Sequence, residues 1–335
     1  MQLQQITTYP KELLTCAPTE LHHIFPQPTL LHLPGKHPEP LFVSVLLHGN
    51  ETTGFLAIQN LLNKYAEQTL PRALSLFFGN TLAAQHSLRR LDKQPDYNRI
   101  WPSTELAHCP EMLFANEIVA VMRNKQVFAS VDIHNNTGLN PHYACINKLD
   151  NTYLQLANLF GRLVVYFLRP VGVQSSAFAE LCPAVTLECG RPGIQNGTEH
   201  AFTYLDACLH LTELATHPVY PQDIDVFHTT AQVKVKPGVS FSFHDTQADL
   251  LFDQNLERMN FTEIAAETCF GFVQGNTDIP VQAINEQGKD ITHQFFKLQQ
   301  KQLQIKRTTM PSMLTLDERV IQQDCLCYLM ERIVV

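Results

Sequence analysis

Residues 41–51 read LFVSVLLHGNE, an apolar run followed at once by the imidazole of His48 and the carboxylate of Glu51. A short apolar run of this kind is typical of a strand that is buried on both faces of a parallel sheet. The residues that follow, 52–68, repeat apolar side chains with helical spacing. The stretch therefore predicts a buried strand, a turn that carries two polar side chains, and a helix.

The same alternation of strand-like and helical segments continues from about residue 40 to residue 215. Strands are predicted at 41–47, 74–78, 127–133, 163–168 and 184–187. Helices are predicted at 52–68, 111–124, 151–160 and 197–215. Apolar strands separated by helices predict an α/β fold, with a largely parallel central sheet and helices on both faces.

The pattern changes near His217, where prolines interrupt the sequence. Short alternating runs follow, such as 232–236 and 302–306, and turn residues separate them. Alternation with a period of two predicts strands that are buried on one face only. We therefore predict a catalytic domain over residues 1–218 and a smaller β-rich domain over residues 219–335.

Composition and charge exclude several classes of function. The chain has 335 residues and a formal net charge of −8, which argues against nucleic acid as a partner. No apolar run approaches the ~20 residues that span a bilayer, and the N-terminal sequence lacks the pattern of a signal peptide. Nine scattered cysteines suit reduced thiols better than a disulfide framework. We expect a cytoplasmic protein without a membrane partner.

Three side chains that bind metals follow or end predicted strands. Besides His48 and Glu51, His134 ends the run VFASVDIH at 127–134. Ligands bind beyond the carboxyl ends of strands in such sheets. A catalytic zinc site uses three protein ligands and keeps one position open for water, so His48, Glu51 and His134 form a candidate zinc site.

Two carboxylates complete the predicted site. Glu188 ends the strand-like run at 184–187 and is the candidate general base that takes a proton from water. Asp132 lies two residues before His134, on the same side of its strand, where it can hold the imidazole N–H. Taken singly, these residues are equally compatible with a turn, a hydrogen-bonded histidine or a helix cap. Their recurrence at strand ends favours the metal site.

The order of these motifs resembles the succinylglutamate desuccinylase/aspartoacylase family, which has a zinc carboxypeptidase-like fold. The resemblance rests on His-Gly-Asn-Glu at 48–51, Asn-Arg at 98–99, Asp-x-His at 132–134 and the late glutamate at 188. It implies a mixed central sheet and one zinc ion held by the three candidate ligands. It also implies that Glu188 promotes the attack of water and then passes the proton to the leaving amine.

The resemblance also assigns residues that bind the substrate. Asn98 and Arg99 correspond to the pair that binds a substrate carboxylate, for which a planar guanidinium is well suited. An arginine upstream polarises the scissile carbonyl in the family; Arg90 is the preferred candidate here, and Arg89 stays open as the alternative. The sequence departs from the family after His134, where it reads Asn135-Asn136 and relatives more often carry Ser-Thr.

Together these observations predict a zinc-dependent amidohydrolase that removes the acyl group from a small N-acyl amino acid. The expected partner is this small anionic substrate, and a homo-oligomer is compatible with the sequence. One alternative is a zinc carboxypeptidase or peptide amidase that uses the same groups. A second alternative is a non-catalytic metal-binding protein of the same fold.

Overall fold

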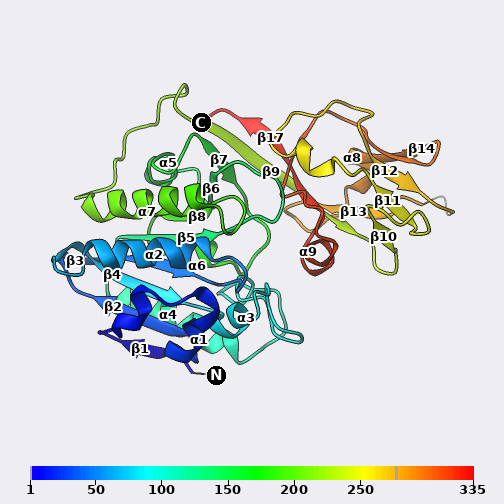
Figure 1. The fold of residues 1–335 in the computed structure, drawn as a ribbon. Coiled ribbons are helices and arrows are strands. Elements are labelled where there is room, and N and C mark those ends of the chain that lie inside the picture. Colours follow the sequence, from blue (N-terminus) through cyan, green and yellow to red (C-terminus); the bar gives the residue numbers. More distant parts are fainter. Residues whose placement is uncertain (1, 276–277) are drawn as a thin grey trace. The chain divides into compact units, whose positions relative to one another are not determined.

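The computed structural model describes residues 2–275 and 278–335, which form two compact units (Figure 1). The first unit comprises the residues up to Asn135 together with His142–Asp225 and the last residue, Val335. The second comprises Asn136–Pro141 and Val226–Val334. The division that the sequence predicts, after residue 218, stays a prediction.

A mixed sheet forms the centre of the first unit (Figure 1). Within this unit, the strands of the sheet lie in the order β1 (Gln4–Ile6), β2 (Thr29–Leu33), β4 (Leu70–Phe78), β3 (Gly35–Val45), β5 (Ala129–His134), β8 (Ala184–Glu188), β6 (Tyr143–Ile146) and β7 (Leu163–Tyr166). Antiparallel pairs join β2 to β4 and β6 to β8, whereas the other neighbouring strands in this series are parallel. The predicted α/β fold with a mixed, largely parallel sheet is therefore confirmed.

Helices cover both faces of this sheet. They are α1 (Leu21–Ile24), α2 (Thr53–Lys64), α3 (Thr81–Gln85), α4 (Glu111–Asn124), α5 (Asn151–Asn158), α6 (Gln174–Phe178) and α7 (Gln195–His210), with short 3-10 turns at Lys11–Leu14 and Pro18–Glu20. Phe42 of β3 stacks on Phe178 of α6, with ring centroids 4.4 Å apart. Val45 of the same strand instead packs against Gly54 of α2. Residues 42 and 45 point to opposite faces because strand side chains alternate.

Close packing explains why a glycine lies in the first turn of α2. A Cβ at Gly54 would lie 2.8 Å from Cγ1 of Val45 and 2.9 Å from Cβ of Ile133. The glycine lets the helix approach β3 and β5, at whose carboxyl ends the candidate metal ligands lie. Phe55, Ile58 and other apolar side chains of α2 are fully buried, which holds the helix on the sheet.

The second unit is rich in β-strands, as the sequence predicts. In one group, β9 (Asp225–Val235) pairs antiparallel with β13 (Val281–Ile284) and with β17 (Cys327–Ile333), and β17 pairs with β16 (Met310–Ser312). A second sheet has the order β10 (Phe241–Ser242), β11 (Leu250–Phe252), β12 (Cys269–Val273), β15 (Gln302–Ile305) and β14 (Phe296–Gln299). The helical segments are Leu256–Met259, α8 (Thr292–Phe295) and α9 (Glu318–Gln323).

Two differences from the predicted elements have simple causes. The strand β6 was not predicted, because its apolar run is only four residues long, whereas the run at 163–168 has six. The strands β1 and β2 precede the region that the sequence pattern resolved. Across residues 2–275 and 278–335, no helix is both long and apolar enough to cross a membrane.

Candidate metal centre and active site

The turn after β3 places His48 and Glu51 side by side. Leu46 adopts a positive φ of 56°, which bends the chain sharply at the end of the strand. Main-chain hydrogen bonds then fix the turn, from Glu51 N to His48 O at 3.1 Å and from Gly49 N to Arg89 O at 3.1 Å. The turn is therefore held both by its own backbone and by the segment that carries Arg89.

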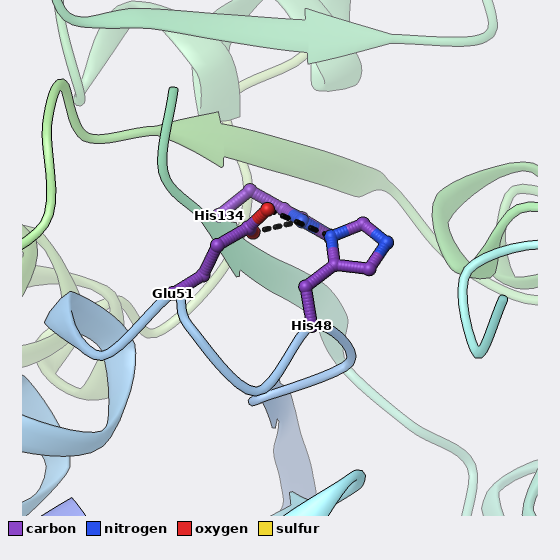
Figure 2. Close-up of side chains that lie close together, drawn as sticks. All are labelled: His48, Glu51 and His134. Atoms are coloured by element: carbon purple, nitrogen blue, oxygen red, sulfur yellow. Dashed lines mark hydrogen bonds and ion pairs between the residues drawn. The ribbon is translucent and has the colours of Figure 1, made fainter. Parts of the chain in front are cut away.

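His134, at the end of β5, completes a cluster with these two residues (Figure 2). Nδ1 of His48 lies 2.8 Å from Glu51 Oε1, and Nδ1 of His134 lies 2.7 Å from Glu51 Oε2. The ligand atoms that the three residues offer lie within 4.8 Å of one another. All three side chains are buried, and each is at most 5% exposed. The structure thus brings together the three ligands that the sequence predicts.

Each imidazole ring of the cluster contacts a second carboxylate through its other nitrogen, Nε2. Nε2 of His48 lies 2.9 Å from Oδ1 of Asp96, and Nε2 of His134 lies 2.8 Å from Oδ2 of Asp132. The other oxygen of Asp132 accepts a hydrogen bond from the Ser44 hydroxyl at 2.7 Å. When Nε2–H donates to a carboxylate, the lone pair of Nδ1 is free to bind a metal, and this arrangement is usual for histidine ligands.

Neighbouring cationic groups stabilise the ionised forms of Glu51 and Asp96. Burial alone would raise the pKa of Glu51, but the two neighbouring imidazoles hold it well below its ordinary value. Burial likewise opposes the charge of Asp96, yet His48 and Arg89 keep the pKa of Asp96 well below its usual range. Both carboxylates are therefore ionised at neutral pH, as a metal ligand and its supporting group must be.

These residues fit a zinc ion. Two imidazole nitrogens and one carboxylate oxygen form a donor set that zinc prefers, and three protein ligands leave a position for water. Both histidines present the same ring atom, Nδ1, toward the shared carboxylate of Glu51. The fit rests on the chemistry of these donors and on the orientation of both rings.

Glu188 lies beside the cluster at the end of β8. Its Cα is the register partner of His134 on the neighbouring parallel strand, so the two side chains point to the same face of the sheet. Burial raises the pKa of Glu188 to about 8; the charges of Glu51 and Asp132 act in the same direction, and His134 opposes them. A carboxylate with a raised pKa near a metal site is suited to accept and return a proton.

The structure distinguishes the two adjacent arginines. Arg89 reaches the cluster, because its Nη1 lies 3.5 Å from Glu51 Oε1 and its Nη2 lies 3.0 Å from Asp96 Oδ2. Arg90 instead donates from Nη1 to the main-chain oxygen of Gln94 at 2.6 Å. The sequence reading preferred Arg90, whereas the geometry places Arg89 at the cluster. The role of either arginine stays a prediction.

The Asn98–Arg99 pair lies next to His134. Nδ2 of Asn98 is 3.3 Å from Nε2 of His134, and Oδ1 of Asn98 accepts a hydrogen bond from the main-chain N–H of Gln174 at 3.1 Å. That bond orients the amide so that its NH₂ group faces the cluster. Nη1 of Arg99 donates to the main-chain oxygen of Asn98 at 2.8 Å. Their role in binding a substrate carboxylate stays a prediction.

Sequence reasoning missed three residues that hold the site. Asp96 supports His48, Gln174 orients Asn98, and Asn135 contacts Glu51, Thr53 and Gly190. A signal existed for Asp96, because Asp96-x-Asn98 repeats the spacing of Asp132-x-His134. Gln174 lies in a five-residue helix, and no period or motif marks it.

A large part of the chain matches a known protein family. Residues 40–204 match the sequence model of the succinylglutamate desuccinylase/aspartoacylase catalytic domain. This part of the chain therefore has the sequence of a catalytic domain of the succinylglutamate desuccinylase/aspartoacylase family. The matched residues include the cluster, Glu188 and the Asn98–Arg99 pair. The match to this family supports an amide hydrolase, that is, a deacylase.

Solved structures share the fold of this chain at low sequence identity. Succinylglutamate desuccinylase from Chromobacterium violaceum is 17% identical, with a TM-score of 0.58, over 89% of this chain and 86% of that one. The enzyme of the same name from Vibrio parahaemolyticus is 14% identical, with a TM-score of 0.60, over 89% and 83%. Murine aminoacylase 3 is 14% identical, with a TM-score of 0.57, over 89% and 96%. A comparison with curated protein sequences gave no match.

Proposed function

We propose that this protein is a zinc-dependent amidohydrolase that removes the acyl group from a small, anionic N-acyl amino acid. One observation carries the proposal: both histidines turn Nδ1 toward Glu51, and Glu188 is the register neighbour of His134. The family of the catalytic domain supports the reaction class. Zinc as the metal is supported by the donor set.

His48, Glu51 and His134 would hold the zinc ion. When bound at such a site, zinc acts as a Lewis acid and lowers the pKa of water. Asp96 and Asp132 keep the two imidazoles oriented and raise their basicity. The protein therefore supplies a rigid donor set, in which hydrogen bonds restrain the metal-binding atoms before the ion arrives.

Glu188 performs the proton transfers of the proposed reaction. It takes a proton from the attacking water, whose oxygen forms a bond to the acyl carbon. It then gives this proton to the amide nitrogen as the carbon–nitrogen bond breaks. The products are a carboxylic acid and a free amino acid, and Glu188 returns to its starting state. A pKa raised by burial makes both directions of transfer accessible near neutral pH.

Cationic and amide groups position the substrate in this proposal. Arg99 and the NH₂ group of Asn98 bind the substrate carboxylate, because a guanidinium and an amide donate several hydrogen bonds to it. Arg89, which lies beside Glu51, stabilises the negative charge that develops on the carbonyl oxygen. We assign this role to Arg89 in place of Arg90 because only Arg89 contacts the cluster.

The decisive experiment compares the wild-type protein with Glu188→Gln. Both proteins are loaded with zinc, their metal content is measured, and turnover is followed on acetylated and succinylated amino acids and on peptides with free C-termini. We expect equal zinc binding, turnover of N-acyl amino acids by the wild type, and a loss of about 10²–10⁴-fold in the variant. Turnover of peptides alone would indicate a carboxypeptidase. Zinc binding without any turnover would indicate a binding protein.

A further inference from the structure

The side chain of Asn135 links the segments that carry Glu51 and Glu188. It follows His134 directly and is 7% exposed. Its Oδ1 accepts a hydrogen bond from the main-chain N–H of Thr53 at 3.2 Å. Its Nδ2 donates to Thr53 Oγ1 at 2.9 Å and to the main-chain oxygen of Gly190 at 2.8 Å. One carboxamide thus contacts two segments that are far apart in the sequence.

The bond to Thr53 fixes the start of α2, which begins two residues after Glu51. The first N–H groups of a helix have no partner within the helix. Within the described residues, the side chain of Thr52, at the N-cap position, makes no capping hydrogen bond. Asn135, the residue that follows β5, supplies the missing acceptor. The main-chain N–H of Asn135 also donates to Glu51 Oε2 at 3.1 Å. Asn135 therefore bonds both to the candidate metal ligand Glu51 and to the first residue of α2.

The bond to Gly190 fixes the turn that follows Glu188. Gly190 has a φ of +68°, a left-handed conformation in which glycine is favoured. The neighbouring main-chain N–H of Cys189 donates to His134 O at 3.0 Å. The backbone just after Glu188 is therefore attached twice to residues 134–135, once through the main chain and once through the carboxamide.

The donors and acceptors around Asn135 admit only one orientation of its amide. The Thr53 N–H can only donate and the Gly190 oxygen can only accept, so Oδ1 faces Thr53 and Nδ2 faces Gly190. An aspartate of the same shape would place an oxygen against the Gly190 oxygen. A carboxamide is therefore required at this position, and a carboxylate does not replace it.

We infer that Asn135 is a positioning residue that sets the placement of the metal ligand Glu51 relative to the general base Glu188. Its kinetic consequence rests on the proposed function, whereas its consequence for metal binding does not. Asn135 has no assigned contact with the substrate, so its loss should lower kcat and zinc affinity while leaving KM unchanged.

The test compares Asn135→Ala and Asn135→Asp with the matched control Thr53→Val. The control removes the Oγ1 acceptor but keeps the Thr53 N–H and the bond from Asn135 to Gly190. Zinc affinity is measured by competition with a chelator, kcat and KM are measured with zinc saturating, and circular dichroism checks the fold. We expect both Asn135 variants to lose about 10–100-fold in kcat. KM should stay unchanged, and Asn135→Ala should also bind zinc about tenfold more weakly. Thr53→Val should resemble the wild type.

Several outcomes would overturn the inference. One is a folded Asn135→Ala protein with wild-type kcat and zinc affinity, and another is a change in only one of these two quantities. A rise in KM at constant kcat would place Asn135 in substrate binding instead. If the wild type turns over no N-acyl amino acid, the proposed function fails. The zinc affinity of Asn135→Ala against Thr53→Val then still decides whether Asn135 positions Glu51.

Discussion

Asp132 and His134 lie two residues apart on β5, and Oδ2 of Asp132 is 2.8 Å from Nε2 of His134. Because strand side chains alternate, this spacing puts both on one face of the sheet. The second oxygen of Asp132 is held by the Ser44 hydroxyl of β3 at 2.7 Å. The hydrogen bonds therefore run from Ser44 through Asp132 to His134, and they orient Nδ1 of His134 toward Glu51.

This relationship predicts how Asp132 affects metal binding. Asp132→Ala removes the acceptor that orients His134, so we expect zinc affinity to fall by about 10–100-fold. Ser44→Ala is the matched control, since it keeps the carboxylate at His134 and removes only its second partner. It should weaken zinc binding much less. Chelator competition measures both, and equal effects of the two substitutions would contradict the prediction.

Arg89 and Arg90 offer a comparison between adjacent residues of the same type. Only Arg89 contacts the cluster, so we expect Arg89→Ala to lower kcat by about 10²–10³-fold with zinc saturating. Arg90→Ala removes a bond to the main-chain oxygen of Gln94 and should change kcat far less. Steady-state kinetics on the best N-acyl amino acid decide the matter. A larger loss in Arg90→Ala would restore the preference based on sequence.

His32 predicts a dependence of stability on pH. Burial, with a smaller effect of the Lys125 charge, lowers the pKa of His32 from 6.5 to about 4. Among the described residues, Nε2 of His32 has no hydrogen-bond partner, and Nδ1 lies 2.9 Å from Ser75 Oγ. Below pH 6.5 the unfolded chain takes up a proton that the folded protein does not. The contribution of neutral His32 to the free energy of unfolding is therefore complete above pH 6.5, and it is lost as the pH falls to about 4.

The corresponding experiment measures urea unfolding at pH 7, 5.5 and 4. His32→Gln should lose roughly 1 kcal/mol less of its unfolding free energy over this interval than the wild type, because the side chain is only half-buried and water screens part of the effect. His37→Gln, a substitution of an exposed histidine close by in the sequence, is the matched control. The prediction would be refuted if the free energy of unfolding fell equally with pH in the wild type and in His32→Gln.

A substitution at Gly54 should set helix propensity against packing in its effect on the free energy of unfolding. Gly54→Ala favours the helix by about 1 kcal/mol, but its Cβ would lie within 3 Å of Val45 and Ile133. Overpacking of this kind costs about 1–3 kcal/mol, so we expect a net loss of unfolding free energy. Asn60, exposed on the same helix, is the control, and Asn60→Ala should stabilise by about 0.5 kcal/mol. A stabilised Gly54→Ala protein would contradict the packing argument.

Local sequence determined much of the first unit. The apolar run at 41–47 and the helical spacing after it predict β3 and α2, which the structure confirms at Gly35–Val45 and Thr53–Lys64. His48 and Glu51 lie three residues apart, so one turn brings them together. Such features are predictable because strand and helix periods, and short turns, depend on neighbouring residues.

Tertiary structure alone decided the parts of the site that depend on strand order and on side-chain direction. Glu188 becomes a neighbour of His134 only because β8 pairs with β5, a pairing between residues more than fifty positions apart. Arg89 and Arg90 are identical in type and adjacent in sequence, yet their different contacts arise from the surrounding chain. The same holds for Asn135 and its bond to Gly190. The residue types and their local spacing can be read from the sequence. Which side chains come into contact depends on long-range packing, because the pairing of distant segments is set by the free energy of the whole folded unit.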